Sequence, residues 1–122
     1  MARDAITIVD AGLNAATAWG AGTTITPAND AVVSPGGNTQ NLFLRITNTH
    51  GSNHTVTIKA GDDPPAFRAG LGDLQVTVPA TSGDVLIPLE SARFIQSDGT
   101  IEVDFETDHA GKAYAVRLPS SV

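Results

Sequence analysis

Two histidines and two aspartates come nearest to a metal site in this sequence. His50 and His54 have the i, i+4 spacing, and Asp62 and Asp63 follow them. Zinc requires three or four ligands that converge at about 2.0–2.3 Å. The i, i+4 spacing brings two histidines together on a helix, whereas these two lie in a run of turn-forming residues. We therefore interpret them as solvated turn residues, and we expect neither a metal nor another cofactor.

A second candidate for chemistry is an acidic stripe. Glu102, Asp104 and Glu106 alternate with apolar residues, and Asp108 lies close behind them. Paired carboxylates hydrolyse glycosides when they face each other about 5–9.5 Å apart across a cleft. Alternation with a full apolar set is instead typical of the solvated face of a half-buried strand. We predict an outer face that resists stacking or docks onto a basic partner, and we do not expect an enzyme.

Two aromatic residues, Trp19 and Phe67, lie outside any strand pattern. Phe67 belongs to residues 61–73, whose two prolines and three glycines exclude a regular strand. A loop of this length that carries Phe67 and Leu71 is expected to be pinned to its own domain or to a partner. Either each aromatic covers an edge of its own domain, or it anchors a neighbouring subunit, because aromatic residues dominate interface hot spots.

Short strands must position these residues. Leu42, Leu44 and Ile46 alternate with other residues, and the pattern resumes at Val56 and Ile58. A period of two predicts half-buried strands, and the residues between them are turn formers. We predict that residues 41–60 form an antiparallel hairpin that seeds the core, with residues 48–54 as its solvated tip.

Similar patterns predict further short strands. Their ranges are 5–9, 23–26, 31–34, 74–78, 84–90, 93–97, 100–106 and 113–118. Asp98-Gly99 predicts a two-residue hairpin that places Arg93 opposite Asp104. Pro88 indicates an edge position or a bulge. In the last strand the residues predicted to be buried are Tyr114, Val116 and Leu118.

The number and spacing of these strands predict the fold class. Eight or nine short antiparallel strands in 122 residues indicate an all-β, single-domain β-sandwich, with a jelly roll as the favoured topology. A chain of this length buries an adequate core without cysteines, of which it has none. We expect residues 1–24 to form an N-terminal arm with the first short strand, and residues 25–122 to form the sandwich body. Residues 11–21 are either a turn or two of helix or an extended arm.

Charge and hydropathy restrict the partners. The formal net charge is −6, and the seven basic residues are scattered, whereas nucleic-acid binders carry basic patches. We therefore expect binding to neither nucleic acid nor an anionic membrane. The sequence contains no apolar stretch of signal-peptide or transmembrane length, so we expect synthesis in the cytoplasm.

Several segments together carry a family resemblance. They are residues 26–30, 42–49, 59–73 and 88–94, and the Asp98-Gly99-Thr100 turn. From Ile25 onward the chain resembles the small head-decoration or minor capsid proteins of tailed phages, particularly those that infect actinobacteria. The resemblance implies a β-sandwich on the outer capsid surface of the virion, commonly a homotrimer, that cements neighbouring major capsid protein subunits after synthesis in the host cytoplasm.

On this hypothesis the N-terminal arm and residues 61–73 contact the capsid. Phe67 is the expected anchor, with a polar rim around it. The candidate contact residues are Ile6, Ile8, Trp19, Asp62, Asp63, Phe67, Arg68 and Leu71. The alternative is a ligand-binding sandwich such as a carbohydrate-binding module, for which the chain offers few aromatic residues as a platform.

Overall fold

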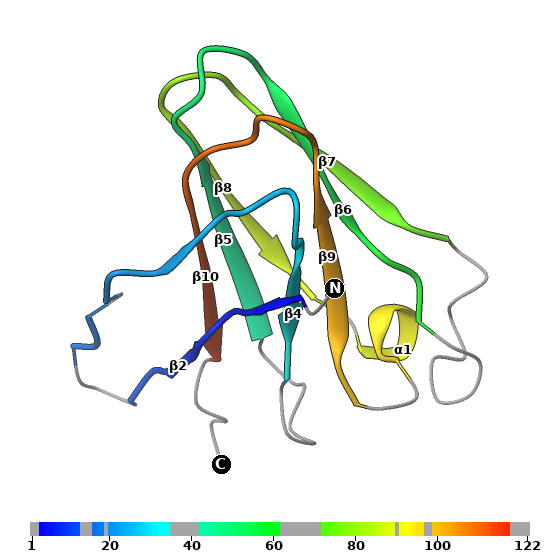
Figure 1. The fold of residues 1–122 in the computed structure, drawn as a ribbon. Helices are drawn as coiled ribbons and strands as arrows, with labels where there is room; N and C mark the ends of the chain where they lie inside the picture. Colours follow the sequence, from blue (N-terminus) through cyan, green and yellow to red (C-terminus); the bar gives the residue numbers. More distant parts are fainter. Residues whose placement is uncertain are drawn as a thin grey trace.

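The computed structural model describes residues 3–12, 16–18, 20–34, 42–61, 72–89, 91–96 and 99–117. Over these residues the protein is two β-sheets packed face to face (Figure 1), which confirms the predicted all-β sandwich. Sheet A contains, in spatial order, β1 (Asp4–Ala5), β4 (Ala31–Val33), β9 (Ile101–Phe105), β6 (His54–Ile58) and β7 (Leu74–Val78). Sheet B contains β2 (Ile8–Asp10), β10 (Lys112–Arg117), β5 (Leu42–Asn48) and β8 (Gly83–Pro88), with β3 (Thr23–Thr24) also paired to β10.

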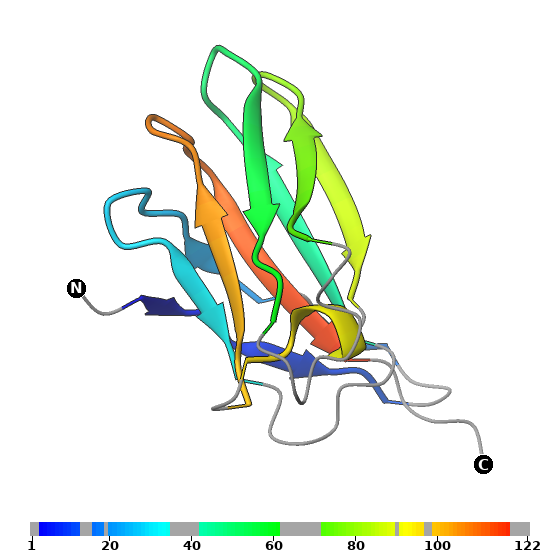
Figure 2. The same cartoon turned by 90° about the vertical axis from the view of Figure 1, so that its right-hand side faces the viewer.

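The core lies between the two sheets (Figure 2). Leu42, Leu44 and Ile46 of β5 are fully buried, as the alternation predicts, and Val56 and Ile58 of β6 meet them from sheet A. The outward residues of β5 and β6 are half-buried. Pro88 lies on β8, the last strand of sheet B in the described order, as its missing N–H donor predicts.

The first strand divides between the two sheets. β1 pairs in parallel with β4 in sheet A, and β2 pairs in parallel with β10 in sheet B. Between them Ile6 is buried in the core. The prediction of antiparallel pairing throughout is wrong for these two strands. β1 extends one edge of sheet A and β2 extends one edge of sheet B, and each is parallel to its neighbour. Residues 3–10 are therefore part of the sandwich.

The predicted hairpin at residues 41–60 is wrong. β5 pairs with β8 and β10, whereas β6 pairs with β7 and β9 in the opposite sheet. The connection between β5 and β6 is an arch from one sheet to the other. Alternation reports which side of a strand is buried, but it contains no information about the neighbouring strand.

The hairpin predicted around Asp98-Gly99 also differs from the structure. Its first arm contains the single helical turn α1 (Ser91–Phe94), and the remaining pairing is a bridge between Ile95 and Ile101. Arg93 does not face Asp104. Its guanidinium donates to the carbonyl oxygens of Gly72 and Asp73, which favours the helical turn over an extended strand.

β10 is buried on the opposite face from the one predicted. Ala113 and Ala115 are buried, while Tyr114 and Val116 are half-buried on the outer side. Ala115 lies opposite Leu44, so large side chains of β5 fill the space that a tyrosine would need. Outside the sheet, Gly22 packs so closely on the Tyr114 ring that a Cβ atom at this position would clash with it.

The orientation of β10 can be tested with one replacement on each face. Ala115→Leu adds volume to a closed core and should lower the free energy of unfolding by about 1–3 kcal/mol. Val116→Leu points outward and should change it by less than about 0.5 kcal/mol. Urea denaturation measures both values, and a larger loss in Val116→Leu would contradict the orientation described here.

Candidate functional site

The structure describes two of the predicted contact residues. Ile6 is buried in the core, so its side chain is not available to a partner, and Ile8 is half-buried and packs against the same core. These two positions are explained by folding alone. The other predicted contacts lie outside the described residues; they are Trp19, Asp62, Asp63, Phe67, Arg68 and Leu71.

The two ends of the 61–73 segment are fixed to the sandwich. Asp73 accepts a hydrogen bond from the backbone N–H of Ala60 at 2.6 Å and pairs with Lys59 at 3.2 Å. The Ala60 hydrogen bond is the main cause that lowers the pKa of the Asp73 carboxyl, so the carboxylate stays charged. The Arg93 guanidinium bonds the Gly72 and Asp73 carbonyls. The base of this predicted loop is therefore attached to its own domain, near α1.

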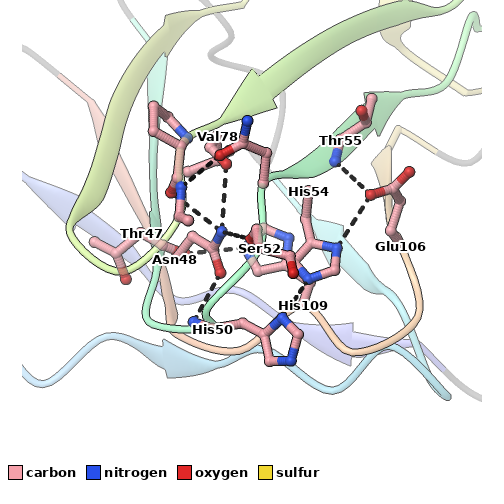
Figure 3. A network of polar contacts seen from close by, with 12 residues as sticks. Thr47, Asn48, His50, Ser52, His54, Thr55, Val78, Glu106 and His109 are labelled. Atoms are coloured by element: carbon pink, nitrogen blue, oxygen red, sulfur yellow. Dashed lines mark hydrogen bonds and ion pairs between the residues drawn. The ribbon is translucent and has the colours of Figure 1, made fainter.

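All three histidines of the chain lie together (Figure 3). They lie where β5 connects to β6 and β9 connects to β10, at the end of the sandwich away from α1 (Figure 1). His54 Nδ1 lies 3.1 Å from Glu106 Oε1, which also accepts the Thr55 backbone N–H at 2.9 Å. His54 Nε2 lies 2.8 Å from His50 Nδ1. The rings of His54 and His109 stack with centroids 5.6 Å apart and an interplanar angle of 19°. We call His50, His54, Glu106 and His109 the histidine cluster.

Hydrogen bonding fixes the protons of the buried rings. The Glu106 carboxylate can only accept, so His54 carries a proton on Nδ1. His109 Nε2 lies 3.0 Å from the Thr47 carbonyl and therefore donates to it. Its Nδ1 is buried and has no hydrogen-bond partner among the described residues. Burial lowers the pKa of His109, because an imidazolium there would lose its water.

The interpretation of residues 48–54 as a solvated tip is wrong for its buried members. His54 and Asn48 are both buried. The Asn48 carboxamide donates to the carbonyls of Ser52, Val78 and Pro79, and its oxygen accepts the His50 backbone N–H. One side chain thus joins the β5–β6 arch to the β7–β8 turn. The sequence spacing does not indicate the contacts of Asn48 with Val78 and Pro79, because these partners are distant along the chain.

The histidine cluster is not arranged as a metal site. No group of three or more His, Asp or Glu residues within the described part of the chain could hold a metal ion. The nearly parallel stacking of His54 and His109 explains this, since nitrogen lone pairs lie in the ring planes and parallel rings do not direct them at one point. The arrangement connects the loops at this end of the sandwich through hydrogen bonds.

The outer face of sheet A is polar. Its outward residues are mostly threonines, acids and a glutamine, namely Thr55, Thr57, Gln75, Thr77, Glu102 and Asp104. Arg3 crosses the acidic stripe, at 2.6 Å from Asp104 and 3.6 Å from Glu102. The predicted outer acidic face is therefore confirmed, with part of its charge neutralised by the N-terminal segment.

The outer face of sheet B is apolar over much of its width. One row across four strands consists of Pro88, Phe43, Val116 and Val9, which lie opposite one another in register. The adjoining row holds Leu86, Arg45 and Tyr114. Leu86 is 58% exposed. We call these two rows the apolar face.

Polar contacts position the second row. The Arg45 guanidinium lies 4.9 Å from the centre of the Tyr114 ring and pairs with Asp84 at 2.7 Å. The Asp84 hydrogen bond is the main cause that raises the pKa of Arg45. Arg45 is thus held against the sheet, where the methylene groups of its side chain and the tyrosine ring extend the apolar surface.

Two shallow hollows flank Val9 on this side of the molecule. One, of about 220 Å³, is lined by Thr7, Val9, Tyr114 and residues 20–22. The other, of about 140 Å³, is lined by Val9, Ala11, Thr17, Ala18 and Val116. The N-terminal segment therefore forms hollows beside the apolar face, of the kind that receive side chains of another protein.

Comparison with known proteins found no matching family model, no matching curated protein and no matching solved structure. No helix among the described residues is long and apolar enough to cross a membrane. The geometry of the site is therefore the basis for a functional hypothesis.

The buried asparagine gives a direct test of the polar network. Asn48→Ala leaves buried carbonyls without donors and should lower the free energy of unfolding by about 3 kcal/mol. Asn48→Asp should cost more at neutral pH, because a carboxylate would then face three carbonyl oxygens.

Asn53→Ala is the matched control. Asn53 is exposed and accepts one hydrogen bond, from the Ala80 N–H, so its removal should cost less than about 1 kcal/mol. Chemical denaturation of the three variants measures the differences. Equal losses in Asn48→Ala and Asn53→Ala would show that the carboxamide of Asn48 does not hold the loops.

Proposed function

We propose that this protein is a head-decoration protein of a tailed phage, which binds the outer surface of the major capsid protein shell and stabilises it. The observation that carries the proposal is the difference between the outer faces of the two sheets. The proposed role is structural, and the apolar face of sheet B is the proposed docking surface.

The two outer faces differ in the free energy that each would gain by binding a partner. An antiparallel sheet that packs on the core with one side normally leaves a polar side to water, and sheet A follows this rule. The apolar face of sheet B, with its exposed Leu86, would instead lose unfavourable contact with water on docking. Aromatic residues and arginine are enriched in protein interfaces, and Phe43, Tyr114 and Arg45 lie in this surface.

The strand order supports the jelly-roll interpretation, a topology found in viral capsid proteins and in lectins. Strands β3 to β10 form two four-stranded sets, β3-β10-β5-β8 and β4-β9-β6-β7. Every pairing within these sets is antiparallel. Setting β1 and β2 aside, this order places the first strand of the set beside the last, as the closure of two Greek keys requires.

The acidic outer face of sheet A fits a location on the outside of the shell. With β6, β7 and β9 turned toward solvent, the carboxylates of Glu102 and Asp104 would remain hydrated and would discourage stacking of further copies. The proposed partners are the major capsid protein and other copies of this chain in a homotrimer. Several weak contacts per trimer would raise the avidity without any new chemistry. Phe67 remains the proposed anchor of a second contact, from residues 61–73.

A carbohydrate-binding module is the alternative function. Sugar sites present an open aromatic ring, and among the described residues Tyr114 is an aromatic residue that lines a hollow. Its ring is covered in part by Arg45 and by Gly22. This packing gives the alternative less support than the apolar face gives to protein docking.

Docking through sheet B can be tested with one charged replacement on each outer face. Leu86→Lys places a charge in the apolar face and should weaken binding to capsid shells at least about tenfold, because the ammonium would lose its water on docking. Thr77→Lys makes a similar change at an exposed position of β7 in sheet A and should leave binding unchanged. Co-sedimentation with assembled shells measures both.

Thermal unfolding of the free variants is the control, and both should keep the wild-type melting temperature. Equal binding of the two variants would contradict docking through sheet B. Absence of the protein from virions purified from the phage that encodes it would contradict the decoration function itself. Binding on a glycan array with micromolar affinity would favour the alternative.

A further inference from the structure

We propose that the histidine cluster is a pH-operated clasp, in which His109 holds residues 106–111 against the sandwich at neutral pH and releases them under mildly acidic conditions. This inference is independent of the proposed capsid function. It rests on the position of His109, on its hydrogen bonding and on the charged groups around it.

The two ring nitrogens of His109 differ in their hydrogen bonding. Nε2 donates to the Thr47 carbonyl at 3.0 Å, and the side chain is 2% exposed. Nδ1 is buried without a partner among the described residues. A second proton on this ring would place an N–H without a hydrogen-bond acceptor in the interior, where the His109 ring packs against Phe105. The folded protein therefore holds His109 neutral.

The neighbouring ring, His54, has a hydrogen-bond partner on each nitrogen. His54 lies between the Glu106 carboxylate and His50 Nδ1. If it gains a proton, the imidazolium donates from Nδ1 to Glu106 and from Nε2 to His50, so both N–H groups are satisfied. The resulting charge faces the His109 ring at a centroid distance of 5.6 Å and opposes a second charge there.

The groups that act electrically on His109 come from three elements. They are His54 on β6, His50 on the β5–β6 arch and Glu106 at the end of β9. Burial has the largest effect on the pKa of His109 and lowers it; the hydrogen bond to the Thr47 carbonyl and Glu106 raise this pKa, and both histidines lower it. The Thr55 N–H and His54 lower the pKa of Glu106, so its carboxylate remains charged between pH 7.5 and 5.5.

The direction of the pH effect follows from linkage. His109 in the unfolded or released segment has its ordinary pKa of 6.5, whereas in the closed segment the pKa is lower. Its contribution to stability is therefore complete above pH 6.5 and is lost as the pH falls below that value toward the lowered pKa. Between pH 7.5 and 5.5 one such group shifts the closed-to-open equilibrium by at most about tenfold, the limit reached when only the released ring gains the proton.

Two backbone hydrogen bonds report whether residues 106–111 are closed. The N–H of Thr49 donates to Ala110 O at 2.8 Å, and the N–H of Ile25 donates to Gly111 O at 3.0 Å. The control amides are Leu89, which donates to Leu42 O, and Ile6, which donates to Val32 O. Neither control bond involves the histidine cluster.

The experiment is amide hydrogen exchange of the intact protein at pH 7.5 and 5.5, corrected for the intrinsic exchange rates. The protection of Thr49 and Ile25 should fall more than the protection of Leu89 and Ile6, by a factor of up to about ten. A parallel change at all four amides, or no change, would overturn the proposal.

Two matched variants assign the effect to His109. His109→Gln keeps a side-chain N–H for the Thr47 carbonyl but does not titrate, so the selective loss of protection should disappear. His50→Gln makes the same replacement within the cluster and leaves His109 in place, so the selective loss should persist. The reverse pattern, or the same response in both variants, would overturn the role of His109.

Histidine NMR of the wild-type protein gives a second measurement that needs no variant. The His109 ring should keep the signals of the neutral Nε2–H form down to the pH at which Thr49 and Ile25 lose protection. Titration of His109 at its ordinary pKa while both amides stay protected would overturn the proposal.

Discussion

The burial of alternate side chains along β5 is the constraint on which the rest of the structure depends. Leu42, Leu44 and Ile46 are fully buried, which requires a second sheet across the core and leaves Phe43, Arg45 and Thr47 on the outer side. Because β5 lies between β8 and β10, its register also determines which residues of those strands meet on the outer face. The same alternation thus produces the core and the apolar face.

The sequence predicts the buried side of a strand well where the two sides differ strongly in polarity. β9 is an example, since Ile101, Val103 and Phe105 alternate with acids and are buried. The prediction failed at β10, where Ala113 and Ala115 alternate with Tyr114 and Val116. Both sets are apolar, so polarity could not choose between them. The choice depends on the large residues of β5 that already occupy the core opposite Ala115.

The strand partners and the histidine cluster could not be predicted from the sequence, for a related reason. The turn formers after β5 fit a hairpin and an arch equally well, and only packing of the two sheets selects the arch. His54 meets Glu106, and Thr47 meets His109, across more than fifty residues of chain. Nothing local distinguishes these histidines from solvated turn residues. The contact residues predicted between 62 and 71 lie outside the described residues, so those predictions stand as hypotheses.

The two functional proposals concern parts of the molecule that share one strand. Outward residues of β5 contribute to the apolar face, while Asn48 at its end is buried in the polar network. Thr47 connects β5 with β10 and with residues 106–111, because its hydroxyl accepts from the backbone N–H of Lys112 on β10 and its carbonyl accepts from His109. The backbone pairing of β5 with β8 and β10 does not depend on the protonation of His109, since it consists of main-chain hydrogen bonds. Opening of residues 106–111 would therefore remove one partner of Thr47 and leave the register of the apolar face intact. The proposed docking surface and the proposed pH-sensitive end are compatible in this sandwich, because the sheet between them is held by contacts that do not titrate.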